Sequence, residues 1–273
     1  MTRDAALRDQ TRSRAARPRF GPAALLMNLT VYPLMALWTL LGIAIFPLIF
    51  PGWKVVTGWG SDRIMRHLIW LYGRGWLLLM SPFVRFRREG LTVAGIRPPA
   101  ILIVNHRSFF DTYCMALLPV YDITFAVRAW PFRMFWYGGF MRLARYLDVE
   151  NLSWEECVAA GRRVFAAHGF LLFFPEGHRS RDGRLQRFYG GAFKLARETG
   201  VPVIPLCITG TDVFLPPGRF WLQPARVTLR ALPPVHPSQF PGPSGHLDLR
   251  RFVRNRMVEQ LNGGTTEQRP TRV

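Results

Sequence analysis

Apolar and charged positions divide this chain into two unlike parts. No side chain between Arg19 and Lys54 is charged, and the stretch Ala23–Phe50 is long enough to cross a bilayer. It is too long for the apolar core of a signal peptide, and no small-residue cleavage site follows it. A second apolar run, Leu68–Phe83, carries Arg74 in its middle, which fits an interfacial helix or the return limb of a hairpin.

Prolines and flanking charges complicate the idea of one simple crossing. Pro33, Pro47 and Pro51 interrupt the first run, and basic residues stand on both sides of it. Because basic flanks favour the cytoplasmic side, we expect a hairpin or re-entrant region with both flanks in the cytoplasm. The alternative is a pair of buried core helices.

The pattern changes from residue 100 onward, where short apolar runs rich in β-branched residues alternate with helical periods. The runs read as strands: Ala100–Val104, Ile123–Val127, Phe170–Phe174, Val203–Ile208 and Val227–Ala231. A capping box at Ser153–Glu156 opens one helix, Gly191–Glu198 reads as a second, and a third carries an apolar stripe from Leu249 to Leu261 opposite arginines.

Strands alternating with helices predict an α/β fold, with a mostly parallel sheet flanked by helices and preceded by an N-terminal apolar helical membrane-anchoring region. We divide the chain into a basic mobile arm (1–22), the anchoring region (23–90), the α/β domain (91–261) and a disordered tail (262–273). In such a fold the chemistry lies where strands end.

The composition of the chain limits the classes of partner that it can bind. Lys and Arg number 36 against 17 Asp and Glu, a formal charge of +19, which implies an anionic partner such as nucleic acid, a membrane surface or a phosphorylated substrate. Nine Trp residues favour the bilayer interface. Cys114, Cys157 and Cys207 stand singly in apolar stretches and read as buried thiols of a reducing compartment.

The first polar cluster, Asn105–Asp111, directly follows a predicted strand. A histidine there can take a proton from an alcohol, and a carboxylate on its far nitrogen stabilises the imidazolium. On one continuous helix His106 and Asp111 would lie about 140° apart and could not meet. With Ser108 as helix cap, His106 lies in the loop and Asp111 can reach back. The alternative is that Asp111 only completes a capping box.

A second cluster, Pro175–Ser180, follows the strand at Phe170–Phe174. It presents Glu176, Gly177 and Arg179 together; an arginine fork grips phosphate, and glycine lets a substrate approach the backbone. The alternative is a solvated charged turn. A metal site built from His106, Asp111, Glu176 and His178 has no paired helical histidine motif behind it, so we predict no metal.

These segments resemble the motifs of a known enzyme family. Asn105–Asp111 matches NHxxxxD, Phe174–Ser180 resembles FPEGTRS and Val201–Leu206 resembles VPVIPV of the glycerolipid acyltransferases typified by bacterial 1-acylglycerol-3-phosphate acyltransferase. The resemblance covers roughly residues 75–235 and implies that His106 is the base and Asp111 its orienting acid. It also implies that Glu176, Gly177 and Arg179 help to hold the acceptor. We add three candidate substrate-binding residues: Asn105, Arg128 and Ser180.

One motif departs from the family. Where its second motif, GxxFxxR, usually places an arginine for glycerol phosphate, this chain has Glu150. Arg128, Arg142 or Arg145 could supply the charge, or the acceptor could be another lysolipid or hydroxylated lipid.

The resemblance implies transfer of a fatty acyl group from acyl-CoA or acyl carrier protein, used as co-substrate without a further cofactor, to a lysophospholipid. Membrane lipids are then partners, nucleic acid is not, and the catalytic domain faces the cytoplasm at the cytoplasmic membrane. The oligomeric state stays open. A lipid hydrolase and a non-catalytic basic binding protein are the rival interpretations.

Overall fold

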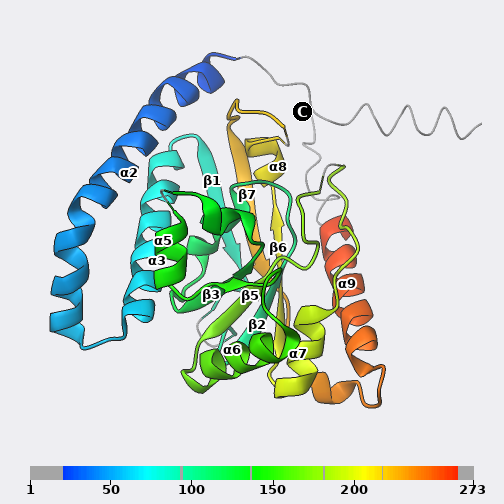
Figure 1. Cartoon of the computed structure of the whole chain (residues 1–273). Helices are drawn as coiled ribbons and strands as arrows, with labels where there is room; N and C mark the ends of the chain where they lie inside the picture. Colours follow the sequence, from blue (N-terminus) through cyan, green and yellow to red (C-terminus); the bar gives the residue numbers. More distant parts are fainter. Residues whose placement is uncertain (1–20, 93–94, 136, 181, 217, 264–273) are drawn as a thin grey trace, which may run out of the picture.

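The structure, a computed structural model, describes residues 21–263 apart from 93–94, 136, 181 and 217. Of the predicted mobile arm (1–22), residues 1–20 lie outside the described residues, and Pro22 begins a helix. Of the predicted disordered tail (262–273), residues 264–273 lie outside them, whereas 262 and 263 are helical, which corrects that end of the prediction. Within them, helices cover both faces of a central sheet (Figure 1).

The sheet has seven strands in the order β1-β7-β6-β2-β5-β3-β4. Neighbouring strands run parallel except β6 and β7, which are antiparallel. The predicted mostly parallel sheet is therefore confirmed. Because β2, β5, β3 and β6 share one direction, the loops that follow them meet at one edge, which we call the carboxyl edge. The strands are β1 (Val84–Glu89), β2 (Ala100–Val104), β3 (Ile123–Val127), β4 (Leu147–Asp148), β5 (Phe170–Phe173), β6 (Val203–Thr209) and β7 (Ala225–Ala231).

Five strands lie where the sequence predicts them, within two residues at each end. Strands β1 and β4 were missed. In β1, arginines alternate with Val84 and Phe86, so the run looks polar, and β4 has only two residues. The predicted division at residue 90 is wrong in one respect, because β1 lies on the anchoring side of it but pairs with β7 in the sheet.

Two apolar cores lie on opposite faces of the sheet. On the first face, helices α2 (Pro22–Thr57) and α3 (Ser61–Met80) pack against residues of β2, β6 and β7 such as Val104 and Leu229. On the second face, α6 (Trp154–Ala166), α7 (Gly191–Thr199) and α9 (Gly245–Gly263) pack against Ile103 and Cys207. Short elements complete the described chain: α4 (Asp111–Cys114), α5 (Gly138–Leu143), α8 (Thr211–Phe214), η1 (Met115–Leu117), η2 (Trp130–Arg133) and η3 (Pro237–Gln239).

Helix α2 contains the first apolar run and extends beyond it at both ends. The three prolines lie inside it without ending it, and the helix is visibly bowed (Figure 1), as expected where proline removes a backbone hydrogen bond. Most of its large apolar side chains are exposed, for example Leu29, Leu40 and Leu48. The alternative of two buried core helices is therefore wrong for α2, whereas α3 buries Trp76 and Met80 in the first core.

Local signals explain the helices of the second face. Ser153 and Glu156 form the predicted reciprocal capping box of α6, and Gly200 ends α7 with a left-handed φ of 73°. Helix α9 buries Leu249, Val253 and Met257, which confirms a docking helix.

Candidate active site

The imidazole of His106 is bound to the carboxylate of Asp111 at the carboxyl end of β2. The Nδ1 atom of His106 lies 2.8 Å from Oδ2 of Asp111, whose side chain is fully buried, while 18% of the His106 side chain is exposed. A carboxylate on Nδ1 keeps the proton there and leaves Nε2 as the basic nitrogen. Within the described chain Nε2 has no hydrogen-bond partner, and the ring packs 4.4 Å from the centroid of Phe174.

The short loop before α4 brings the two side chains together. Asp111 is the first residue of α4, and its Oδ2 also accepts the backbone N–H groups of Arg107 at 2.5 Å and Ser108 at 2.7 Å. The predicted geometry, with His106 in the loop and Asp111 reaching back, is confirmed. The predicted cap is wrong: Ser108 does not cap α4, and its hydroxyl donates to the carbonyl of Leu215. The alternative of an unbound loop histidine fails as well.

Asn105 anchors this loop to the next strand. Its side-chain oxygen accepts the N–H of Ile208 at 2.7 Å, its Nδ2 donates to the carbonyl of Ile208 at 2.9 Å, and the residue is 1% exposed. Both polar atoms are occupied and no surface remains for a lipid. The expectation that Asn105 contacts the acceptor is therefore corrected to a positioning role.

Glu176 has a similar role, against expectation. Its Oε1 accepts the backbone N–H of His106 and its Oε2 accepts that of Gln186, each at 2.7 Å. The side chain is 1% exposed, and burial raises the pKa of its carboxyl above the usual range. Glu176 therefore supports the backbone of the histidine rather than the acceptor.

The rest of the second cluster divides between structure and surface. Gly177 has a φ of 70°, in a turn closed by its N–H on the carbonyl of Phe174, so a side chain there would be strained. Ser180 is buried, donates its N–H to the carbonyl of His106, and bonds its hydroxyl to Asp182 and Arg184. Arg179 is exposed and has no ion-pair or hydrogen-bond partner in the described chain, so it remains a candidate acceptor contact.

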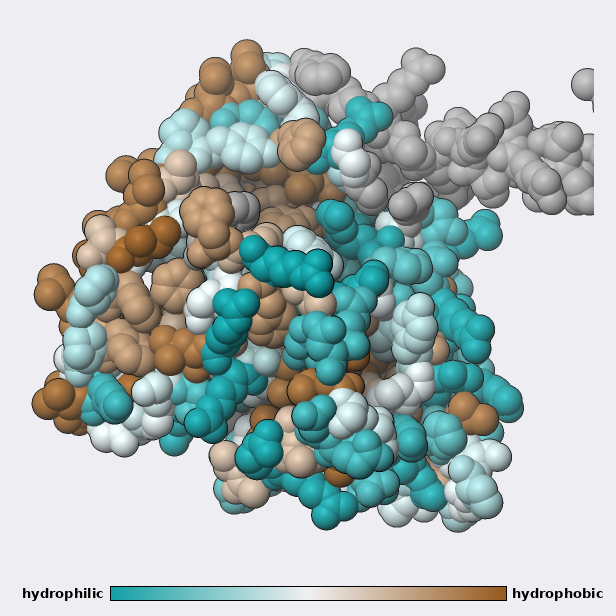
Figure 2. Space-filling view, viewed as in Figure 1, coloured by the Kyte–Doolittle hydropathy of each residue, from teal (hydrophilic) through white to brown (hydrophobic). Residues whose placement is uncertain are grey.

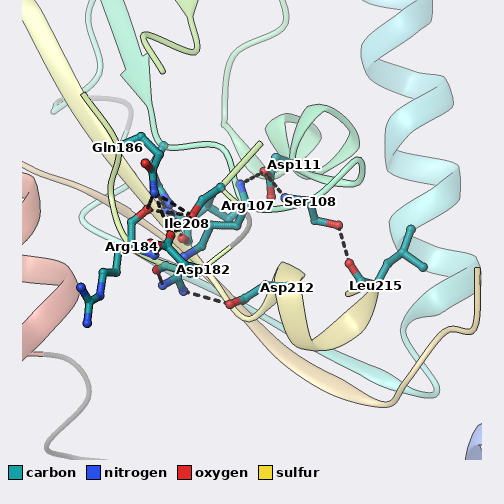
Figure 3. A network of polar contacts seen from close by, with 12 residues as sticks. Arg107, Ser108, Asp111, Asp182, Arg184, Gln186, Ile208, Asp212 and Leu215 are labelled. Carbon is teal, nitrogen blue, oxygen red and sulfur yellow. Dashed lines mark hydrogen bonds and ion pairs between the residues drawn. The ribbon is translucent and has the colours of Figure 1, made fainter. Parts of the chain in front are cut away.

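The side chain of Arg107 connects the two strand-end loops to α8, the short helix that follows β6 (Figure 3). Its guanidinium donates to the carbonyl of Gly183 and lies 3.5 Å from the carboxylate of Asp212. Gln186 closes the second loop by donating to Asp182 at 2.8 Å. Sequence reasoning missed these positioning residues, because Arg107 and Asp212 are brought together only by the order of strands.

Arg128 follows β3 at the same edge and holds the residue that departs from the family pattern. Its Nε lies 2.6 Å from Oε1 of Glu150, whose Oε2 accepts the N–H of Ala129 at 2.8 Å. These bonds, first from Ala129 and then from Arg128, lower the pKa of Glu150. Arg128 is more than half exposed, and its role in acceptor binding stays a prediction.

The arrangement of the site favours general-base catalysis over catalysis by a covalent nucleophile. Cys114 is fully buried, and burial together with the nearby Asp111 raises the pKa of its thiol well above the usual value, so it is a poor nucleophile. Cys207 is also buried, whereas Cys157 is only partly so, which corrects that prediction. His106, Asp111, Glu176 and His178 do not gather into a metal-binding group, and neither do other side chains in the described chain.

Comparisons with known proteins agree with this arrangement. Residues 84–209 match the family model described as Acyltransferase. The chain is 28% identical over 73% of its length to a 1-acyl-sn-glycerol-3-phosphate acyltransferase of Limnanthes douglasii, covering 68% of that protein. It is 31% identical over 52% of its length to the enzyme of that name from Salmonella typhimurium, covering 58% of it.

The fold is shared with a solved structure. The crystal structure of the 1-acyl-sn-glycerophosphate acyltransferase PlsC from Thermotoga maritima superposes with a TM-score of 0.69 at 20% identity, covering 91% of this chain and all of that one. The family match spans β1 to β6 and includes both strand-end loops. Over this segment, which holds the candidate active site, the chain is similar to the acyltransferase family.

Proposed function

We propose that this chain transfers a fatty acyl group from a thioester, acyl-CoA or acyl carrier protein, to the free hydroxyl of 1-acylglycerol-3-phosphate, giving phosphatidic acid. The observation that carries the proposal is the His106 imidazole, fixed through Nδ1 on the buried Asp111 and open at Nε2. The named relatives supply the acceptor, since each is called a 1-acyl-sn-glycerol-3-phosphate acyltransferase.

The reaction needs one proton carrier. The acceptor hydroxyl gives its proton to Nε2 of His106 while its oxygen attacks the thioester carbonyl, and Asp111 stabilises the imidazolium. As the C–O bond forms and the C–S bond breaks, the imidazolium returns the proton to the departing thiolate. Direct transfer without an acyl-enzyme accords with the burial of Cys114.

The experiment is incubation of the detergent-solubilised protein with labelled acyl-CoA and a panel of lysolipids, read by mass spectrometry. We expect labelled phosphatidic acid from lysophosphatidic acid. Release of free fatty acid with no acylated lipid would identify a hydrolase instead. Acylation of every lysolipid except lysophosphatidic acid would overturn the choice of acceptor.

We further propose that the chain works at the cytoplasmic membrane with its catalytic domain in the cytoplasm. Among the described helices, α2 is long and apolar enough to cross a membrane, and apolar residues gather over it on the surface (Figure 2). Helix α3 packs beside α2 and returns to the sheet. Labelling of single cysteines placed in the N-terminal arm and in α9 should show both on the cytoplasmic side; opposite sides would refute the hairpin.

A further inference from the structure

The residues around His106 account for the acceptor hydroxyl but not for the binding of the thioester donor. We propose that an acidic acyl carrier protein docks on Arg85, Arg87 and Arg226, three arginines on the open face of β1 and β7, which we call the arginine strip. The proposal rests on the proposed function, and it selects the carrier protein as a donor that this chain recognises.

The strand register places these arginines on one face. Val84 and Phe86 point into the first core, so the alternation of a strand turns Arg85 and Arg87 to the opposite side. Strands β1 and β7 are parallel, with Arg85 paired to Arg226, which brings two guanidinium groups side by side. All three arginines are exposed.

No acidic side chain in the described residues neutralises the strip. The nearest acid along β1, Glu89, is bound to Arg230, and no ion pair or hydrogen bond is made by the side chains of Arg85, Arg87 or Arg226. Like charges directly opposite each other on neighbouring strands destabilise a sheet. An anionic partner would relieve this repulsion, which is the charge complementarity behind the proposal.

The arginine strip lies on the face of the sheet opposite the helix proposed to enter the membrane, α2. Helices α2 and α3 lie on the first face of the sheet and α9 on the second, the face that bears the strip (Figure 1). The surface is apolar over α2 and hydrophilic toward α9 (Figure 2). A bilayer that receives α2 therefore lies on the other side of the sheet, and the strip is open to a partner from the aqueous phase.

The strip also adjoins the catalytic edge. A Cβ atom built on Gly210, the residue directly after β6, would lie 1.9 Å from the carbonyl oxygen of Arg226, so the two backbones touch. Two residues later Asp212 pairs with Arg107, the neighbour of His106. Since β7 and β2 are separated only by β6, the strip begins about 10 Å from the histidine strand, at roughly 5 Å per strand.

The shape of the strip favours a protein over a nucleotide. Its charges are spread along two pleated strands, whereas small ligands are held in concave sites. An acidic helix can lie along such a surface and meet several arginines together. A carrier protein docked there would extend its prosthetic arm across β6 to His106.

The test measures carrier binding and transfer separately, with full-length detergent-solubilised protein. Binding of palmitoylated acyl carrier protein is followed by fluorescence anisotropy in the His106→Ala background, where the thioester is not consumed. We expect Arg85→Glu and Arg226→Glu each to weaken binding about tenfold at low salt, and the difference to shrink as salt is raised. Arg85→Glu should fold well, because it places a carboxylate opposite Arg226.

Arg88→Glu is the matched control, since Arg88 is an exposed arginine of the same strand on the opposite face. It should leave binding of the carrier protein unchanged.

With His106 intact, the strip variants should raise KM for acyl carrier protein while leaving KM for acyl-CoA and binding to anionic vesicles unchanged. Unchanged carrier binding would refute the docking site. An equal rise in KM for acyl-CoA would assign the strip to the nucleotide, and lost vesicle binding would assign it to the bilayer; both overturn the proposal. Wild-type protein that binds the carrier but acylates no lipid would contradict the proposed function instead.

Discussion

The loops after β2 and β5 contain the same types of residue but have different roles. Each follows a buried strand and carries a carboxylate near a histidine and an arginine. In the first loop the buried Asp111 holds a histidine whose second nitrogen is left open. In the second loop the buried Glu176 bonds only backbone N–H groups, one of them that of His106. The first loop therefore carries the proposed base, and the second holds the backbone of that loop in place.

This difference separates two kinds of buried carboxylate. Asp111 binds a side chain that changes protonation in the proposed reaction, whereas Glu176 binds backbone groups that do not. Substitutions at the two positions should therefore differ in whether they alter the chemical step or the stability of the loop.

The largest effect is expected at the reacting nitrogen. His106→Ala removes the proposed base and should lower kcat on the order of a thousandfold or more. Thermal stability and membrane association should stay near wild type, because the imidazole is at the edge of the site. Acyl transfer measured with labelled acyl-CoA at close to the normal rate would end the mechanism.

Asp111→Asn should come next, with a loss of about a hundredfold in kcat. The amide oxygen can take the place of Oδ2 and keep the three bonds, while the amide nitrogen takes the place of Oδ1, which is buried without a partner. Geometry is then largely retained and the charge is lost. A purely structural role would instead lower the melting temperature and spare kcat, so both are measured on the same sample.

The sequence predicts the reacting loop better than its supports. His106 and Asp111 are five residues apart, and the position of a strand end and a helix start is enough to bring them together. Asn105 and Ile208 are 103 residues apart, and their contact depends on β6 lying beside β2. The role of Glu176 depends in the same way on β5 lying on the other side. Sequence patterns predict local geometry, whereas these partners require the strand order.

The same limit explains the strands. Strand β2 is buried along its whole length, so an unbroken apolar run predicts it with the right bounds. Strand β1 has one face on the core and one in solvent, and its arginines conceal the alternation. The arginine strip could not be found before the register with β7 was known.

Glu176→Gln should have a smaller effect, of about tenfold on kcat, together with a lower melting temperature. One half of the amide must present N–H to a backbone N–H that now donates to Glu176, either that of His106 or that of Gln186, and a buried donor facing a donor is unfavourable. Glu155→Gln is the control, since Glu155 is exposed in α6 and should change neither quantity. Normal stability with an increased KM for the acceptor would restore Glu176 to substrate binding.

The smallest effect is expected at Glu150, the residue that departs from the family pattern and binds Arg128. Glu150 accepts hydrogen bonds from Nε of Arg128 and from the N–H of Ala129. The two terminal nitrogens of Arg128 have no partner in the described chain, so they can bind a phosphate. Arg128→Gln should therefore raise KM for lysophosphatidic acid about tenfold, whereas Glu150→Gln, which only loosens the arginine, should raise it about twofold to threefold, as for an exposed ion pair. Neither substitution should change kcat, and neither should change KM for a neutral acceptor such as a monoacylglycerol.

Equal changes in KM for the charged and the neutral acceptor would show that the pair merely supports the loop. A lower KM for lysophosphatidic acid in Glu150→Gln would show that the carboxylate repels the phosphate instead of positioning its partner, and the ratio of kcat/KM for the two acceptors separates these outcomes.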